Sequence, residues 1–304
     1  MDLVTARGVV KRYGSHTALN GVDLDIAHGI TGLLGANGAG KTTILGMLIG
    51  LHRADAGSIS VLGHDPWSAG PKVRERLGYA PEHHQLPPDV RAADFVRHVA
   101  ELHGLPKAEA TTRSSDALWL VGLGEERFRP MGTMSTGQRQ RVKLAQAISH
   151  DPDLIMLDEP TDGLDPVQRD TMLELIKSVA SEFSIDVILS SHLLDEVEAV
   201  CDNVTIIGDG VTIASGTLDQ LRDPDSIGVI VEIDAPDHVA SEIGAQIQGL
   251  GFVVEIDHSR LVIQGDDERV FDAARDACAQ AGVGIVRLQR RRLTLEDVFL
   301  DRLG

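Results

Sequence analysis

The sequence predicts an α/β fold with a mixed core sheet, an antiparallel β subdomain, an inserted helical subdomain and a small α+β C-terminal domain. Apolar strand patterns within 153–160 and 186–192 flank a helical stretch at 166–183, an order that favours parallel strands joined by a crossover helix. Alternating apolar and polar residues with glycine turns fill roughly the first sixty positions, as half-exposed antiparallel strands do. A turn-rich break near 223–225, after which the pattern restarts, predicts a second domain.

The elements of the first domain follow in order from local patterns. Strands are predicted within 6–14, 18–29, 29–34 and 57–63, a helix within 41–49, and a hairpin within 204–216 that turns at Asp209-Gly210. The helical subdomain is predicted at about 89–149. Helical spacing there marks an apolar face made of Val90, Phe95, Val99 and Leu102. In the stretch 166–183 it marks a face made of Val167, Met172, Leu175, Ile176, Val179 and Phe183.

The second domain reads as β-α-β-β-α-β. The predicted strands are 228–233, 251–256, 260–265 and 284–289, and the predicted helices are about 238–250 and 268–282, with a short closing helix at 293–303. The sequence thus divides into a first domain at 1–222 and a C-terminal α+β accessory domain at 226–304.

Charge and composition exclude several classes of function. The net charge is −18 and the pI is about 5.0, so the phosphate backbone of DNA or RNA would be repelled and no nucleic-acid partner is expected. Two cysteines without CxxC spacing and an N-terminus without a signal pattern fit a reducing cytoplasm. No segment approaches the roughly 20 apolar residues that span a bilayer, so a membrane role would require a partner.

A glycine-rich turn between a strand and a helix carries the strongest motif. Gly35-x-x-x-x-Gly40-Lys41-Thr42 matches the phosphate loop in full. Such a loop wraps backbone N–H groups around an anion at a helix N-terminus. Lys41 would reach the β- and γ-phosphates, and the Thr42 hydroxyl would hold Mg²⁺. The alternative is an ordinary glycine-rich turn, which explains the composition but not the complete spacing.

Two adjacent carboxylates, Asp158 and Glu159, end the apolar strand that begins at Leu154. Ligands bind at this end of the strands in open parallel sheets, and two neighbouring buried acids are costly without a cation or a catalytic task. Asp158 suits Mg²⁺ and Glu159 suits polarising the attacking water. A solvated acidic turn is the alternative for either acid alone.

With these motifs, residues 2 to about 220 resemble the nucleotide-binding subunit of an ABC transporter, a P-loop NTPase cassette. Met134-Ser135-Thr136-Gly137-Gln138 resembles the family's signature, 162–165 the loop that crosses the dimer interface, and 190–192 the switch histidine. The resemblance implies that Lys41, Glu159 and His192 are catalytic. It implies ATP contacts from Tyr13, Gly35, Asn37, Gly38, Ala39, Gly40, Lys41, Thr42 and Thr43, and from the opposite subunit Ser135, Thr136, Gly137, Gln138 and Asp165. It implies that Mg²⁺ is held by Thr42, Asp158 and Glu82.

Two positions depart from the commonest family pattern. Thr136 replaces a glycine, and Glu82, in Gly78-Tyr79-Ala80-Pro81-Glu82, replaces a glutamine. A carboxylate cannot donate the amide hydrogen bond, so Glu82 would have to act through Mg²⁺ or water. The neighbouring His83 and His84 raise the alternative of a transition-metal site, but side chains adjacent in sequence seldom point at one ion.

One phosphate loop and one signature per chain imply that two copies meet head to tail around two ATP molecules. The ending of the chain, with Leu295-Glu296-Asp297-Val298-Phe299, resembles ATPases of ABC-2-type exporters. We therefore expect a homodimer that powers a separate membrane permease at the cytoplasmic face of the membrane. The alternatives are a soluble ABC ATPase that acts as a mechanical switch on nucleic acid or ribosomes, and a nucleotide-binding regulator without catalysis. Copurification with a membrane protein and ATP turnover distinguish these three classes.

Overall fold

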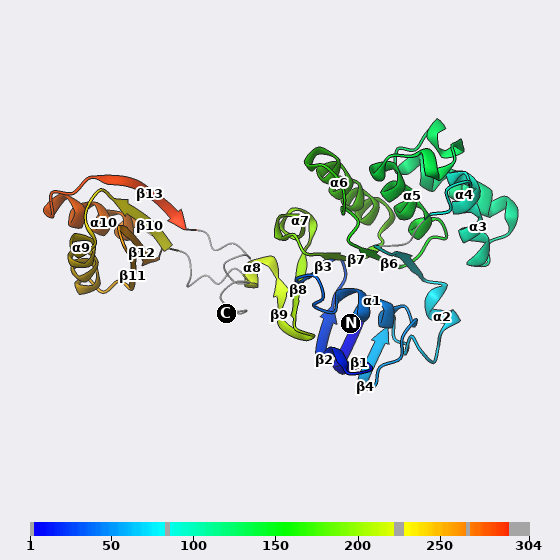
Figure 1. The fold of residues 1–304 in the computed structure, drawn as a ribbon, viewed down its shortest axis with the longest axis horizontal. Coiled ribbons are helices and arrows are strands. Elements are labelled where there is room, and N and C mark those ends of the chain that lie inside the picture. The colour runs from blue at the N-terminus through cyan, green and yellow to red at the C-terminus, as the bar shows by residue number, and fades with distance from the viewer. Residues whose placement is uncertain (1–2, 83–85, 222–227, 266–267, 292–304) are drawn as a thin grey trace. The chain divides into compact units, whose positions relative to one another are not determined.

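A computed structural model describes residues 3–82, 86–221, 228–265 and 268–291 of the chain (Figure 1). The chain forms two compact units, Met1–Leu218 and Asp219–Gly304, which are considered separately. The predicted closing helix at 293–303, the histidines His83 and His84 and the break at 223–225 lie outside the described residues.

The first unit is built around a mixed sheet. Its described strands lie in the order β5-β6-β7-β3-β8-β9. Their bounds are β3 Ile30–Leu34, β5 Leu77–Ala80, β6 Leu154–Asp158, β7 Asp186–Ser191, β8 Asn203–Gly208 and β9 Val211–Thr217. β5, β6, β7, β3 and β8 run parallel, and β9 returns antiparallel through a tight turn in which Asp209 and Gly210 have positive φ. The predicted parallel sheet and hairpin are confirmed, and β5 forms one edge of the sheet.

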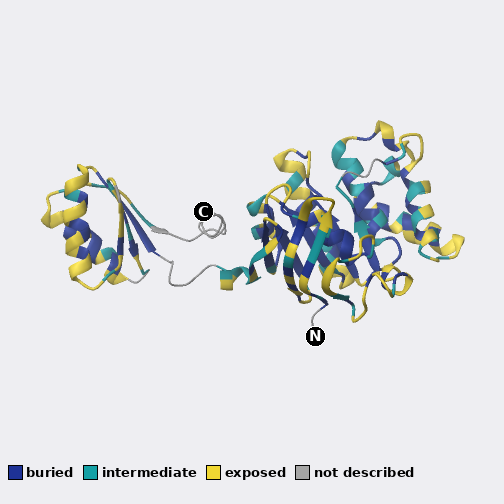
Figure 2. Cartoon of the chain, turned by 60° about the horizontal axis from the view of Figure 1, so that its bottom comes forward, coloured by how far each residue is buried: buried dark blue, intermediate teal, exposed yellow. Residues whose placement is uncertain are grey.

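A second, antiparallel sheet with the order β2-β1-β4 confirms the interpretation of the first sixty residues. It consists of β1 Val4–Tyr13, β2 His16–Ile26 and β4 Ala56–Val61. The helix α1, Lys41–Leu48, packs between this sheet and the mixed sheet. Buried side chains from all three layers form one core, among them Leu24, Ile44, Leu48 and Met156. In Figure 2 the colour for buried residues runs through the strands of this unit. The core therefore fixes the strand-to-helix turn from which α1 begins.

The helical subdomain is inserted between β5 and β6. It contains α3 Ala92–Leu102, α4 Lys107–Leu120, short 3₁₀ turns at Glu125–Phe128 and Met131–Thr133, and α5 Thr136–Ile148. The remaining helices of the first unit are α2 Pro71–Arg74, α6 Pro166–Phe183, α7 Leu194–Val200 and α8 Leu218–Leu221.

The predicted apolar faces of two helices are partly wrong. In α3 the buried residues are Ala92, Val96 and Ala100, whereas Leu102 is 72% exposed. In α6 the buried residues are Met172, Leu173, Ile176 and Val179, whereas Val167 and Phe183 are exposed. Small residues carry the buried face of α3 because α4 and α5 pack closely against it, so counting only large side chains located the wrong stripe.

The second unit is a four-stranded antiparallel sheet in the order β11-β12-β10-β13. Its elements are β10 Gly228–Ile233, α9 Asp237–Gly249, β11 Val254–Asp257, β12 Arg260–Gln264, α10 Glu268–Gln280 and β13 Ile285–Arg291. The two helices and the sheet enclose a separate core that includes Val229, Ile243, Leu261 and Ala274. The order of elements agrees with the β-α-β-β-α-β pattern, a split β-α-β arrangement.

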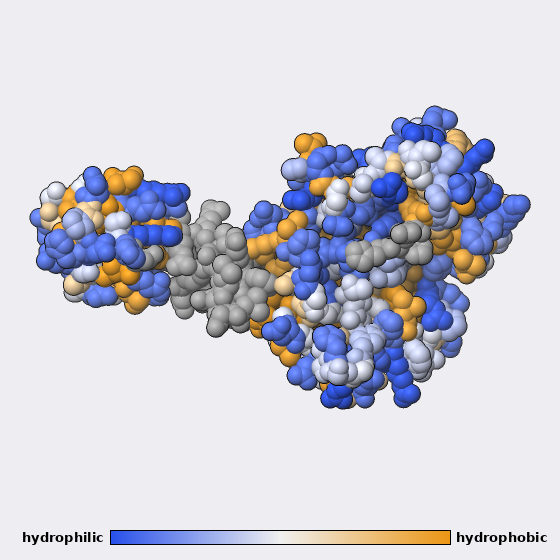
Figure 3. Space-filling view, viewed as in Figure 1, coloured by the Kyte–Doolittle hydropathy of each residue, from blue (hydrophilic) through white to orange (hydrophobic). Residues whose placement is uncertain are grey.

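On the face seen in Figure 3, hydrophilic residues predominate and apolar residues form separate patches. Among the described helices, none combines the length and the apolar character needed to cross a bilayer.

Candidate functional site

The glycine-rich turn follows β3 and ends where α1 begins. Gly40 is the N-cap of α1 and has a φ of 107°, which side chains disfavour. A Cβ at this position would lie 2.6 Å from Leu19 Cδ2 and 2.8 Å from the carbonyl oxygen of Ala18. Glycine is therefore required by both conformation and space, and it leaves the N–H groups at the start of α1 accessible to an anion.

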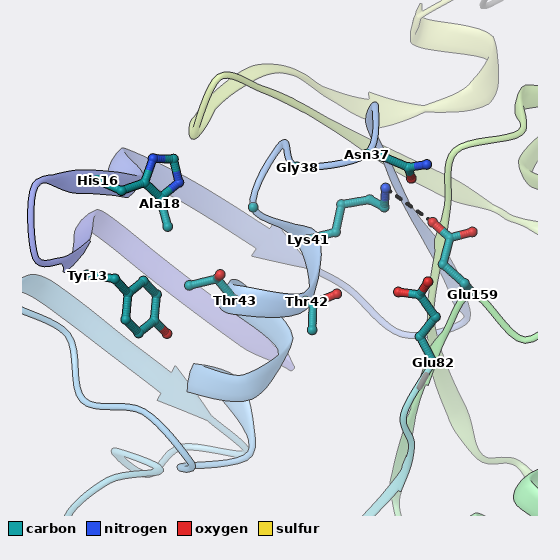
Figure 4. Close-up of a pocket in the computed structure, with 11 residues that line it drawn as sticks. Tyr13, His16, Ala18, Asn37, Gly38, Lys41, Thr42, Thr43, Glu82 and Glu159 are labelled. Carbon is teal, nitrogen blue, oxygen red and sulfur yellow. Dashed lines mark ion pairs between the residues drawn. The ribbon is translucent and has the colours of Figure 1, made fainter. Parts of the chain in front are cut away.

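Lys41 is only 6% exposed, and oxygen atoms lie close to its buried ammonium group. The Nζ atom donates to the carbonyl oxygens of Gly35 at 2.7 Å and Ala36 at 3.3 Å, and it lies 3.2 Å from Glu159 Oε1 (Figure 4). The Lys41 side chain therefore folds back over the loop that precedes it and bonds to that loop's own carbonyl oxygens. The Glu159 carboxylate is the third group that faces the ammonium. A phosphate oxygen of a bound ligand would take the place of this carboxylate.

An open pocket of about 610 Å³ surrounds this lysine. Of the residues predicted to contact ATP or Mg²⁺, those that line it are Tyr13, Asn37, Gly38, Gly40, Lys41, Thr42, Thr43 and Glu82, and the predicted catalytic residue Glu159 lines it as well. Tyr13 is 45% exposed, and its ring lies at the opposite end of the pocket from Glu159 (Figure 4). A flat aromatic surface at one end and a cationic loop at the other match a base joined to phosphates.

The acid pair lies at the carboxyl end of β6, buried and tied to the neighbouring strand. Asp158 is 2% exposed and Glu159 is 4% exposed. Ser190 Oγ donates to Asp158 Oδ1 at 2.6 Å and accepts the backbone N–H of Glu159 at 3.0 Å. Glu159 has a φ of 48°, an uncommon conformation for a side chain other than glycine, and the bond to Ser190 helps to hold it.

His192 follows β7 and contacts the second oxygen of the same glutamate. Its Nδ1 lies 2.8 Å from Glu159 Oε2, so Glu159 stands between Lys41 and His192. The histidine side chain is 36% exposed, which leaves part of the ring accessible. Lys41, Glu159 and His192 are therefore brought together, in agreement with the sequence expectation that they act at one site.

The signature residues lie elsewhere on the same unit. Ser135, Gly137 and Gln138 line a separate hollow of about 180 Å³, and none of these three lines the pocket around Lys41. Ser135 caps α5: its Oγ accepts the N–H of Gln138 at 3.2 Å, while Gln138 Oε1 accepts the N–H of Ser135 at 3.1 Å. These two reciprocal bonds form a capping box at the start of α5. The Ser135 hydroxyl hydrogen stays available to an acceptor outside the helix.

The side chain of Thr136 forms a hydrogen bond within the signature turn. Thr136 Oγ1 accepts from Arg139 Nη2 at 3.1 Å, and Arg139 Nη1 donates to the carbonyl oxygen of Met134 at 2.7 Å. The replacement of the usual glycine thus anchors an arginine to the signature turn. Asp165 caps the next long helix, α6, by accepting the N–H of Gln168 at 2.9 Å. Neither Thr136 nor Asp165 lines the pocket of Lys41.

Several residues near the acid pair were missed by the sequence analysis. Ser190 was noted only as part of the histidine segment. Glu196, on α7, is 1% exposed and accepts from Thr161 Oγ1 and Ser191 Oγ, both at 2.6 Å. Burial, followed by the negative charges of Asp158 and Glu82, raises the pKa of Tyr79 well above its ordinary value. No local pattern marks these residues, because their partners lie on other elements of the fold, some of them more than thirty positions away.

The residues expected to hold Mg²⁺ fit a hard cation. Thr42 and Glu82 line the pocket, and Asp158 Oδ2 is buried without a hydrogen-bond partner among the described residues. A buried carboxylate oxygen that lacks a donor is costly, and a divalent cation would remove that cost. The chemistry of this donor set, with a hydroxyl and carboxylates, is that of a magnesium site.

Comparison with known proteins links this geometry to one family. A family model described as ABC transporter matches residues 19–162. The linearmycin resistance ATP-binding protein LnrL of Bacillus subtilis (strain 168) is 30% identical over 99% of this chain and 98% of its own length. The daunorubicin resistance ATP-binding protein DrrA3 of Streptomyces coeruleorubidus is 32% identical over 99% and 96%. A Nod factor export ATP-binding protein I of Cupriavidus metallidurans is 32% identical over 99% and 97%.

Solved structures agree with the fold. An ATP-binding subunit of an ABC transporter has a TM-score of 0.64 and 29% identity, covering 72% of this chain and 92% of its own. The protein cbiO1 of Clostridium perfringens, part of the ABC transporter complex cbiONQ, has a TM-score of 0.64 and 28% identity, with coverage of 71% and 88%. The sequence comparison and the structure comparison therefore both give ABC transporter ATP-binding proteins, which agrees with a pocket suited to a nucleotide.

Proposed function

The chain belongs to the ABC transporter ATP-binding proteins, a family that hydrolyses ATP, and from this premise we propose that two copies of it clamp two ATP molecules head to tail. In this proposal residues 1–222 are the ATP-binding cassette and 226–304 are an accessory domain. Each ATP would be held by the phosphate loop of one copy and by the signature turn of the other.

One observation carries the proposal. Ser135, Gly137 and Gln138 line a hollow other than the pocket around Lys41. A capped helix N-terminus is a site for an anion, yet the phosphate loop of the same copy has its own helix for that purpose. A second copy would place the N-terminus of α5, with Ser135 and Gly137, against the γ-phosphate and complete the site.

The residues around the pocket would share the chemistry of hydrolysis. Lys41 would leave Glu159 for the β- and γ-phosphate oxygens and neutralise the charge that develops there. Glu159, released from the lysine, would orient the attacking water and accept its proton. His192, which contacts Glu159 Oε2, would hold that carboxylate and sense the γ-phosphate.

Thr42, Asp158 and Glu82 would hold Mg²⁺, which supplies positive charge to the β- and γ-phosphate oxygens when bound. Tyr13 would stack on the adenine ring at the other end of the pocket. Cassette closure around ATP and its opening after hydrolysis would then drive a separate membrane permease.

The relatives support export as the task. Two of them are named for resistance to linearmycin and daunorubicin and one for Nod factor export, and each aligns with nearly the whole chain. We assign the protein to the energy-coupling subunits of ABC-2-type exporters, acting at the cytoplasmic face of the membrane through its permease. Recovery of the full chain with an integral membrane protein tests this assignment, whereas recovery with ribosomes or nucleic acid would favour the mechanical switch.

Glu159→Gln tests the catalytic centre. The amide keeps the shape of the side chain but cannot accept a proton, so turnover should fall about a hundredfold or more while ATP affinity stays within about threefold. At saturating Mg·ATP the variant should accumulate as a closed dimer, measured by size-exclusion chromatography with light scattering. Glu182→Gln, an exposed exchange of the same kind on α6, is the matched control. Normal turnover by Glu159→Gln would contradict the role given to this residue.

A further inference from the structure

The edge strand β5 is closed by side chains instead of by a neighbouring strand. One side of β5 pairs in parallel with β6, and the carbonyl oxygens of Leu77, Tyr79 and Pro81 point to the other side, toward α5. Carbonyl groups that are buried at a sheet edge need donors. α5 packs against β5 at Gly78, where a Cβ would collide with the carbonyl oxygen of Ala147.

Three side chains from α5 and the turn after it supply those donors in order. His150 Nε2 donates to Leu77 O at 2.9 Å, and Gln146 Nε2 donates to Tyr79 O at 3.1 Å. Lys143 Nζ donates to Pro81 O at 3.1 Å and to Glu82 O at 2.7 Å. Lys143 and Gln146 lie on one face of α5, and His150 follows in the turn after it, whereas alternate carbonyl groups along β5 point to the same side of the strand. Side chains at these spacings can therefore reach successive carbonyl oxygens of β5.

The last of these contacts is the unusual one. An amide or a neutral imidazole is sufficient to satisfy a carbonyl, but Lys143 brings a charged group that is only 8% exposed. Burial lowers the pKa of Lys143, against the opposing pull of Asp162, Glu82 and Asp158. A buried ammonium group costs free energy that a mere edge contact does not require. Its two hydrogen bonds go to the carbonyl oxygens of Pro81 and Glu82, and Glu82 lines the pocket of Lys41.

We propose that Lys143 is a positioning residue for Glu82: it fixes the backbone at Pro81 and Glu82 so that the Glu82 carboxylate faces the Mg²⁺ and γ-phosphate end of the pocket. Because α5 begins at the signature, the same helix presents Ser135 to one ATP and holds Glu82 at the other through Lys143. The inference rests on the proposed function and extends it to a residue outside the known motifs.

The test compares Lys143→Met with Lys143→Arg in the full chain. Methionine keeps the length but cannot donate, so kcat should fall about tenfold with the KM for ATP within about twofold. In equilibrium binding titrations, which need no turnover, the Mg²⁺ concentration that half-saturates ATP binding should rise about threefold or more. Arginine keeps a charged donor and should restore both quantities to within about threefold of the unsubstituted chain.

A double-mutant cycle separates positioning from general loss of structure. In a Glu82→Ala background, Lys143→Met should cost less than about twofold in kcat, because the group that it positions is gone. Gln146→Met, which removes the neighbouring contact to Tyr79, is the matched control and should change kcat by the same factor in both backgrounds. An equal effect of Lys143→Met in both backgrounds, or an unchanged Mg²⁺ requirement, would overturn the inference. ATP turnover by the unsubstituted chain and its loss in Glu159→Gln would stand regardless, so the two failures are distinguishable.

Discussion

Lys41 and Lys143 are two buried lysines in different regions of the same unit, and they make the same kind of contact. Lys41 is 6% exposed and donates to the carbonyl oxygens of Gly35 and Ala36, whereas Lys143 is 8% exposed and donates to those of Pro81 and Glu82. The first lysine starts α1 at the phosphate loop, and the second lies in the middle of α5. The surroundings, not the residue type, therefore separate their roles.

The difference is in which residues line the cavity beside each ammonium group. Lys41 lines the open pocket with Thr42 and Glu159. An anionic ligand in this pocket could therefore replace Glu159 as the partner of the ammonium group. Lys143 faces a groove lined also by Glu82, Gln140 and Asp162, and its hydrogen bonds hold a loop. The comparison teaches that two equally buried lysines differ in their partners: Lys41 faces a carboxylate as well as carbonyl oxygens, whereas Lys143 donates to backbone carbonyl oxygens.

The largest expected effect comes from Lys41→Met. Loss of the charge at the β- and γ-phosphates should lower kcat/KM for ATP by about a thousandfold, about 4 kcal/mol, and weaken ATP binding as well. Lys143→Met, in contrast, should leave binding at saturating Mg²⁺ nearly unchanged. Lys177→Met, an exposed exchange on α6, is the control. Equal losses of ATP affinity in the Lys41 and Lys143 variants would break the comparison.

Gly78→Ala should disrupt the region of Lys143 without touching that of Lys41. The new methyl group would meet the carbonyl oxygen of Ala147 and push α5 away from β5, so the free energy of unfolding should fall by about 3 kcal/mol. Urea unfolding measures it. The control is Gly249→Ala at the end of α9, where a Cβ would have no neighbour within 4 Å. Gly104 also has open space around it, but its positive φ would add backbone strain, so it is not used. A stability loss below about 0.5 kcal/mol would show that α5 does not need this close contact.

Ser190→Ala should affect the acid pair that faces Lys41. The hydroxyl both donates to Asp158 and accepts from the N–H of Glu159, so its removal takes the donor from the buried Asp158 Oδ1 and leaves the Glu159 N–H only its longer bond, 3.3 Å, to the Ser190 carbonyl oxygen. The expected cost is about 2 kcal/mol of unfolding free energy, with turnover reduced about tenfold. Ser181→Ala, at an exposed position of α6, controls for loss of a hydroxyl. Unchanged turnover would mean that Glu159 keeps its strained backbone without this bond.

The smallest effect concerns the far end of the α5 contacts. Burial, with the neighbouring charge of His103, lowers the pKa of His150 to about 4. Between this value and the unfolded value near 6.5, the unfolded chain binds more protons, so stability falls as the pH falls through this window. Going from pH 6.5 to about 5.5 should cost on the order of 1 kcal/mol. His150→Gln, which can still donate to Leu77, should flatten that part of the stability profile; an unchanged slope would assign it to other groups.

Much of the pocket could be predicted from the sequence because its residues are neighbours along the chain. Gly35 to Thr43 form one turn whose geometry depends on local glycine conformations, and Asp158 and Glu159 end one apolar strand. The element order of both units follows from periodicity for the same reason. The buried faces of α3 and α6 were partly mispredicted, since burial there depends on which helices pack nearby.

The sequence by itself therefore determined the motifs and the fold class, and it supplied the residues that we propose to contact the nucleotide. Only the tertiary structure decided that Ser190 joins the acid pair, that Glu196 ties α7 to β7, and that Lys143 ends a row of donors along β5. These contacts join residues 31, 5 and 61 positions apart. The physical reason is that a hydrogen bond needs two partners, and when they lie on different elements neither local spacing nor propensity records which partner packing will supply.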